Sequence, residues 1–170
     1  GGAITRNNLN YRLDDENCEN HMNGLYLVGK NMHVDNHTVV DHLKPHSVSN
    51  ELYKGIIKDK STGVFNGKIF VRKDAQKTNA YQSSKNILLS DDATINTKPQ
   101  LEIYADDVKC SHGTSTGKID ESALFYLNAR GIGTESAKSM LLSSFAVEVI
   151  DKIEVDSLKE KIIQAFEKTL

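Results

Sequence analysis

A cysteine and a histidine two residues apart, in the segment Cys110-Ser111-His112-Gly113, are the side chains in this sequence best suited to chemistry. In an extended segment Cys110 and His112 point to the same face, because side chains alternate along a strand. A soft thiolate beside an imidazole can bind iron or zinc, or hold a persulfide sulfur. The pair could also be a cysteine nucleophile activated by His112, or a buried cysteine beside a turn histidine. Spacing alone favours the structural interpretation and leaves the other two open.

A second candidate site is the histidine-rich segment from His21 to His46, which holds five of the six histidines. His33 and His37 have even spacing, so on a strand they share a face. Imidazole is a common metal ligand, and Asp35 or Asp41 could complete a metal site in this segment. The alternative is that these histidines bond turn backbone and solvent. That alternative is favoured, because the spacing matches no established metal signature.

The bulk composition excludes several function classes. The 170 residues carry a net charge of −2, so the basic excess that a nucleic-acid backbone requires is missing. No apolar run approaches the roughly 20 residues of a membrane span. Two cysteines are too few for a disulfide framework and indicate a reducing compartment, the cytoplasm. Gly131-x-Gly133 lacks the Lys and Ser/Thr of a phosphate loop, so any ATP must enter through a partner.

The elements that position these residues divide the chain near residue 118. Thirteen of the fourteen asparagines lie before that point, where we expect them to hold polar turns between short strands. No helix-period stretch separates the apolar runs, so a βαβ fold is not expected. A sandwich and a β-helix both remain open. The expected strands are Leu25–Val28, Thr38–Val40, Leu52–Ile57, Val64–Val71, Ile87–Leu89 and Leu101–Ala105.

Beyond residue 118 the pattern predicts three helices. A short first helix ends at the Gly131 break, and Thr134 is expected to cap the second. A stripe that must be buried against the body or a partner is expected along one side of that second helix, formed by Ala137, Met140, Leu141, Ser144, Phe145 and Val149. Ser157, followed by Glu160, predicts a capping box for the third helix. In that helix the apolar residues recur every four positions, at Leu158, Ile162, Phe166 and Leu170.

The stretch from Pro99 to Gly113 resembles the SufB/SufD family of iron–sulfur cluster assembly scaffolds, and its Cys-Ser-His-Gly segment resembles the SufD branch. The SufB branch has a Glu-His-Glu type segment at that place. Thr114 stands where the SufD branch usually has Ala after this segment. The resemblance covers essentially the whole chain and corresponds to the C-terminal part of the family. Because the sequence also lacks an initiator methionine, we expect it to be part of a longer protein. Supporting stretches are residues 33–35, 64–67, 97–99 and 125–132.

The resemblance implies a mainly β fold with an α tail: a right-handed parallel β-helix at residues 1–118, then a small C-terminal helical domain at 119–170. It also implies a complex with SufB, joined through the end of the β-helix, and with the ABC-type ATPase SufC, joined through the helical tail. Whether the chain forms a homodimer without SufB stays open.

In the family the histidine of this segment is implicated in building the nascent iron–sulfur cluster, opposite a SufB cysteine. That role maps to His112, with Cys110 as a weaker candidate. The expected cargo is therefore iron or a nascent cluster at the partner interface. For the ATPase contact, we expect residues of the helical tail, namely Phe125, Arg130, Met140 and Phe145.

Three function classes remain. The leading one is a non-catalytic assembly scaffold. The second is a β-helix enzyme of the polysaccharide-lyase type, which a long groove lined with carboxylates and basic residues would favour. The third is a purely structural interaction module, which would be favoured if His112 were buried without a route to a partner.

Overall fold

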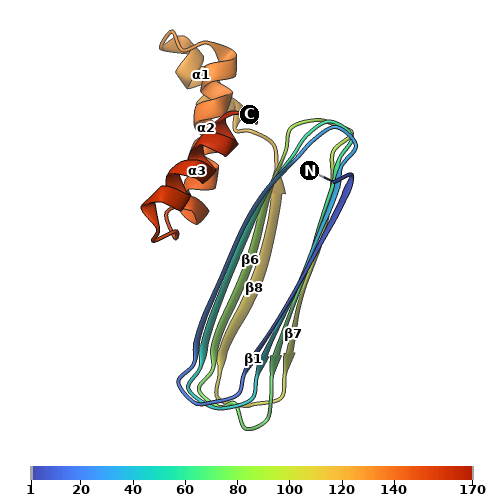
Figure 1. The fold of residues 1–170 in the computed structure, drawn as a ribbon, viewed down its shortest axis with the longest axis vertical. Helices are drawn as coiled ribbons and strands as arrows, with labels where there is room; N and C mark the ends of the chain where they lie inside the picture. The colour runs from blue at the N-terminus through green and yellow to red at the C-terminus, as the bar shows by residue number, and fades with distance from the viewer. Residues whose placement is uncertain (1, 170) are drawn as a thin grey trace.

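Eight parallel strands and three helices make up the computed structural model, which describes residues 2–169 (Figure 1). The strands form two four-stranded sheets, β1-β3-β5-β7 and β2-β4-β6-β8. The chain alternates between the two sheets and advances one position in each with every coil. The bounds of the strands are β1 Ile4–Leu13, β2 Glu19–Val28, β3 His33–His42, β4 Val48–Ile57, β5 Thr62–Val71, β6 Asn79–Leu88, β7 Thr94–Ile103 and β8 Lys109–Gly117.

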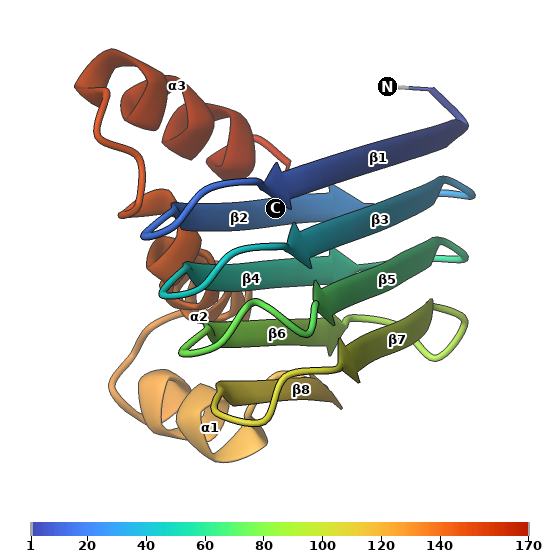
Figure 2. The ribbon, with the colours of Figure 1, turned by 90° about the horizontal axis from the view of Figure 1, so that it is seen from below.

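Successive coils stack in register. His33 pairs with Ile4 on one side and with Thr62 on the other. At the corners, non-glycine residues turn the chain with φ values between 57° and 63°, among them His46 and Lys77. This arrangement is the expected parallel β-helix, and it removes the sandwich alternative (Figure 2). The fold class is thereby confirmed, whereas the division into two domains stays a prediction.

The strands are longer than the apolar runs predicted. Strands β1 to β7 each have ten residues. The predicted runs covered only part of β2 to β7, and none of them lay in β1 or β8. The expectation that asparagines would lie in turns is wrong for most of them. Asn7 and Asn36 lie in adjacent strands, and the side-chain amide of Asn7 donates to Asn36 Oδ1 at 2.9 Å. Stacking of like side chains lets an amide bond along the stack, so polar residues can occupy strand positions.

The interior between the two sheets is apolar at both ends of the coils. One cluster contains Val40, Ile69 and Val71, all fully buried. A second lies at the opposite corner and contains Val28 and Ile57. Between them the inward side chains are larger or polar, with the rings of Tyr53 and Phe65 at 4.9 Å between centroids. The β-helix therefore holds its coils together by apolar contacts near the corners and by polar contacts midway along the strands.

Helices α1 (Glu121–Ala129), α2 (Thr134–Ile150) and α3 (Asp156–Glu167) run along the outer face of the β2-β4-β6-β8 sheet, from the β8 level back toward the β1 level (Figure 2). Asp120 caps α1 by accepting bonds from the N–H groups of Ser122 and Ala123. The two caps expected from sequence are wrong. Gly133 and Val155 occupy the N-cap positions of α2 and α3, and neither makes a side-chain cap bond.

The buried side of α2 also differs from the expected stripe. Ala137 and Val149 of that stripe are buried against the body, whereas Met140 is 51% exposed. Leu142, Ala146 and Ile150 instead pack against Ile56 of β4. The reason is the shape of the sheet surface, which receives the small Ala146 over Ile56, so the helix is rotated relative to the stripe read from hydrophobicity alone.

The third helix agrees better with its apolar pattern. Phe166 is buried and Ile162 packs against the same cluster, although Leu158 is 48% exposed. Leu170 lies outside the described residues. Beneath α2, the buried Lys54 of β4 donates to the Phe145 carbonyl at 2.7 Å and pairs with Glu148 at 2.5 Å. These contacts attach the helices to the β-helix in addition to the apolar packing.

A substitution at Gly55 tests the close packing inside the coils. A Cβ at this position would overlap the ring of Tyr26, which donates to Asn86 at 2.8 Å. We expect Gly55→Ala to lower the free energy of unfolding by about 1–3 kcal/mol through overpacking. Urea unfolding measures the loss. The matched control is Gly117→Ala, where an added Cβ meets nothing within 4 Å. Equal stability of the two variants would contradict the proposed packing.

A pH dependence follows from His42, which is fully buried with its Nε2 at 2.8 Å from Ser49 Oγ. Burial lowers the pKa of His42 from 6.5 to about 4, against the opposing effect of Asp41. Below about pH 6.5 the unfolded chain therefore binds a proton that the folded chain does not, and stability falls with acidification.

We expect His42 to account for about 2 kcal/mol of lost unfolding free energy between about pH 7 and about pH 5. The measurement is urea unfolding of the wild type and of His42→Gln at both pH values. The wild type should lose more stability on acidification than the variant does. Identical pH dependence in the two proteins would show that His42 is not held neutral by the fold.

Candidate functional site

The last strand of the β-helix carries the Cys-Ser-His-Gly segment. Strand β8 pairs with β6 on one side and, within residues 2–169, with no strand on the other (Figure 2). His112 is exposed, and a Cβ added at Gly113 would meet nothing within 4 Å. An open edge of this kind offers unpaired backbone groups to another chain. The segment therefore lies where a second protein could approach it.

Register shows which way His112 faces. It lies beside Gln82, which is only 3% exposed and points between the sheets. Two residues further along β8, the hydroxyl of Thr114 lies 3.3 Å from that of Thr97 on β7, across the interior. Because alternate side chains share a face, His112 also belongs to the interior face, at the uncovered end of the β-helix. It is exposed because no further coil lies over it in the described chain.

Cys110 lies on the same face as His112, as the alternation predicts. It pairs in register with Ala80, is half-buried, and packs against the cluster that contains Leu13 and Met22. Burial raises the pKa of the Cys110 thiol, and a backbone hydrogen bond from Ala80 opposes this only in part. A thiol with a raised pKa is a poor nucleophile and a poor metal ligand at neutral pH. These observations support the structural interpretation of Cys110 in this chain.

A polar column behind His112 was not found from sequence. Glu51, Gln82 and His112 occupy the same register position on β4, β6 and β8. Gln82 donates from Nε2 to Glu51 Oε2 at 2.6 Å, and burial raises the pKa of Glu51. In sequence these residues are separated by about one coil each, so only knowledge of the coil length could have brought them together.

The histidine-rich segment is dispersed over β2, β3 and the corner that follows β3. His37 Nε2 lies 2.7 Å from the buried Asp35 and 3.1 Å from the amide of Asn66. His33, four residues away on the same strand, is separated from His37 by roughly 13 Å at the usual strand rise. Within residues 2–169, no three His, Cys, Asp or Glu side chains converge in a geometry suited to a metal ion. The metal role of His33 and His37 stays a prediction.

The residues expected to bind the ATPase differ in exposure. Phe125 is 74% exposed and Met140 is 51% exposed. The guanidinium of Arg130 lies 5.3 Å from the ring centre of Tyr126, and both side chains are exposed. Phe145 is half-buried, with Lys54 Nζ at 4.5 Å from its ring centre. Phe125, Arg130 and Met140 are therefore available to a partner, whereas Phe145 belongs largely to the joint between helix and sheet.

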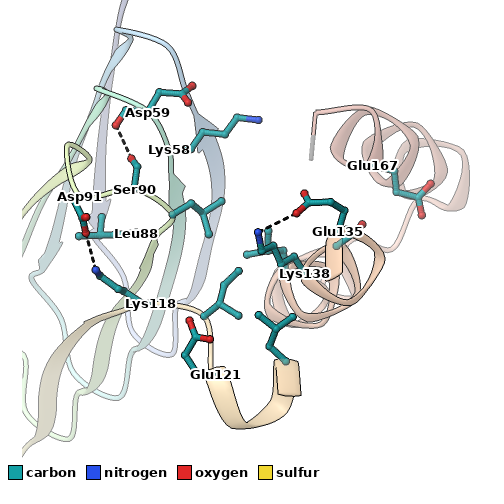
Figure 3. A pocket seen from close by; sticks show the side chains of 15 residues that line it. Lys58, Asp59, Leu88, Ser90, Asp91, Lys118, Glu121, Glu135, Lys138 and Glu167 are labelled. Atoms are coloured by element: carbon teal, nitrogen blue, oxygen red, sulfur yellow. Dashed lines mark hydrogen bonds and ion pairs between the residues drawn. The ribbon is translucent and has the colours of Figure 1, made fainter. Parts of the chain in front are cut away.

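A pocket of about 600 Å³ lies between the sheet ends and helices α1 and α2 (Figure 3). Two ion pairs lie in its walls: Lys118 with Asp91 at 2.7 Å, and Lys138 with Glu135 at 3.0 Å. Pairing with Lys118 lowers the pKa of Asp91. The pocket is thus lined by both carboxylates and basic residues, and Leu142 contributes apolar surface.

None of the helices in the described part of the chain combines the length and the apolar character needed to cross a bilayer. The comparison with family models matches residues 1–145 to the SufBD core domain of the SUF system for FeS cluster assembly. The match includes all eight strands and most of α2.

Three curated relatives agree with this match. The chain is 41% identical over 163 residues to the iron–sulfur cluster assembly protein SufD of Escherichia coli K12, covering 96% of this chain and 38% of that protein. It is 39% identical over 155 residues to the chloroplastic protein ABCI7 of Arabidopsis thaliana, covering 89% of this chain and 32% of that protein. It is 31% identical over 143 residues to SufD of Bacillus subtilis 168, covering 84% and 33% respectively.

The chain thus spans between 32% and 38% of the length of these three relatives. The expected family is confirmed by the family model and by identities of 31% to 41% to its members over 84% to 96% of this chain. The chain belongs to the SufBD family of the SUF iron–sulfur cluster assembly system.

Proposed function

We propose that this chain is part of a scaffold subunit of an iron–sulfur cluster assembly complex, and that His112 binds iron or the nascent cluster where a SufB-like subunit covers the end of the β-helix. The observation that carries the proposal is the position of His112 on the edge strand β8, whose outer side is unpaired within residues 2–169; the side chain is exposed and on the interior face. Membership of the SufBD family supports iron or a nascent cluster as what His112 binds. Family membership also argues against the polysaccharide-lyase alternative.

The chemistry fits an imidazole at a subunit boundary. Neutral imidazole binds iron, and histidine in place of thiolate raises the potential of a cluster. A partner strand added to β8 would cover His112 and exclude water from the metal, while supplying thiolate ligands of its own. In this proposal Cys110 mainly fills space beneath the segment, in agreement with its packing against the interior cluster. Iron and sulfur are cargo, and the chain itself performs no turnover.

We further propose that α1 and α2 bind a SufC-like ABC-type ATPase. Helix α1 lies at the β8 end of the stack and α2 runs along β4 and β2 (Figure 2). Phe125 and Met140 present apolar surface to solvent. Exposed aromatic and methionine side chains are enriched at protein interfaces. The same helices are attached to the sheet through Lys54 and Glu148, so a movement of the ATPase could be transmitted to the β-helix. The protein is expected to act in the cytoplasm.

The first test concerns His112. His112→Ala, made in the complete chain and assembled with its two partners, is expected to lower cluster formation on the order of 10-fold or more, because an iron ligand is removed. Cys110→Ala should have a milder effect. The measurement is iron and sulfide content per complex, together with the visible absorbance of the cluster.

The matched control is Ser111→Ala, an exposed residue of the same strand whose side chain belongs to the other face. Partner association and ATP hydrolysis should be unchanged in all three variants. Normal cluster formation with His112→Ala would remove the proposed ligand and leave a subunit with a purely structural role.

The second test concerns the helices. Phe125→Asp and Met140→Asp should each weaken binding of the ATPase by about tenfold, since a charge would replace apolar contact area. Because both side chains are exposed, far-ultraviolet circular dichroism should not change. Binding is measured by titration calorimetry with the complete chain.

Val155→Asp serves as the control, since it adds the same charge at an exposed position where an N-cap aspartate is favourable. Phe145→Asp is expected to disturb the fold instead, because that ring packs at the sheet. Unchanged affinity in folded Phe125→Asp and Met140→Asp would place the ATPase elsewhere on the molecule.

A further inference from the structure

The side chain beneath His112 has an unused hydrogen-bond acceptor. Gln82 is 3% exposed, and its Oε1 has no hydrogen-bond partner. An unpaired buried carbonyl oxygen costs free energy, so a nearby donor is expected to use it. His112 is the register neighbour of Gln82 on β8, about 4.8 Å away at the usual strand separation. Both side chains belong to the interior face.

The orientation of the Gln82 amide is fixed from two sides. Its Nε2 donates to Glu51 Oε2 at 2.6 Å, on the side of the earlier coil. Across the interior the amide lies against Gly67, where an added Cβ would overlap the amide group. With the nitrogen engaged by Glu51, the amide cannot exchange its two ends without losing that bond. Oε1 is therefore left free, and the His112 ring, which makes no bond to it in this structure, would have to turn inward to use it.

We propose that Gln82 is a positioning residue for His112: its Oε1 accepts a hydrogen bond from one ring N–H of His112 and thereby fixes the tautomer of the imidazole. The other ring nitrogen is then unprotonated and faces the uncovered end of the β-helix. This inference rests on the proposed function of His112. Histidines that bind metals commonly donate their second ring N–H to a carbonyl or carboxylate oxygen, which orients the ring and fixes its tautomer.

The proposal assigns a role to each residue of the polar column formed by Glu51, Gln82 and His112. Glu51 holds Gln82, Gln82 holds His112, and Gly67 leaves room for the amide between the sheets. The bond from Nε2 to the buried Glu51 explains why position 82 is polar, and the unpaired Oε1 is the part of the amide to which we assign a role toward β8. No residue of the column other than His112 would touch the cargo.

Long-range ¹H–¹⁵N spectra of the complete chain, labelled at histidine and recorded without metal, report the tautomer of His112 directly. The wild type is expected to show one dominant neutral tautomer. Gln82→Met, which keeps the length but removes the acceptor, should give the mixture typical of a short peptide. Gly67→Ala should shift the tautomer populations of His112 in the same direction, because the added Cβ would displace the Gln82 amide. Ser84→Ala, one inward position further along β6, is the control and should leave the tautomer unchanged.

The outcomes separate this inference from the proposed function. A mixed tautomer in the wild type would overturn the positioning role without any variant. An unchanged tautomer in folded Gln82→Met would do the same. If Gln82 sets the tautomer but His112→Ala assembles clusters normally, the positioning stands and the function of His112 falls. In the complex, Gln82→Met should weaken iron binding roughly 10- to 100-fold while His112 stays in place.

Discussion

In-register stacking of coils is the constraint on which the rest of this structure depends. Each strand bonds to the strand one coil earlier and one coil later, as His33 does with Ile4 and Thr62. Backbone hydrogen bonds are therefore satisfied along the stack. Within residues 2–169, the outer side of each terminal strand has no neighbouring strand to bond to. The same rule aligns side chains into columns, so that a residue's neighbour is found about one coil away in the sequence. Both the stability of the body and the exposure of its last strand follow from it.

The functional proposal uses this unfinished end. In the middle of the stack polar side chains bond along their columns, as Gln82 of β6 does to Glu51 of β4. At β8 the column stops, and His112 keeps one side toward Gln82 and the other toward whatever covers the end. A ligand placed there is ordered by the fold and still accessible. A second subunit could then complete both the sheet and the coordination of iron in one contact.

The helices cover the apolar outer face of the β2-β4-β6-β8 sheet. Ile56 on that face is fully buried beneath α2, together with Ala146. Lys54 lies in the same layer and would be costly to bury alone, but its pairing with Glu148 and with a helix carbonyl offsets the loss of hydration. Covering this face leaves Phe125 on the far side of α1, free for a partner.

The sequence by itself determined that Cys110 and His112 share a face, because alternation along a strand is local. It also determined the helical breaks at the glycines and, through the resemblance of the segment before Gly113, the β-helix and the family. Only the tertiary structure decided that this face points inward, that β8 is an edge strand within residues 2–169, and that Gln82 lies beneath His112. It likewise decided that Met140 faces solvent. These facts depend on hydrogen bonds and packing between residues about one coil or more apart, for which no local periodicity carries a signal.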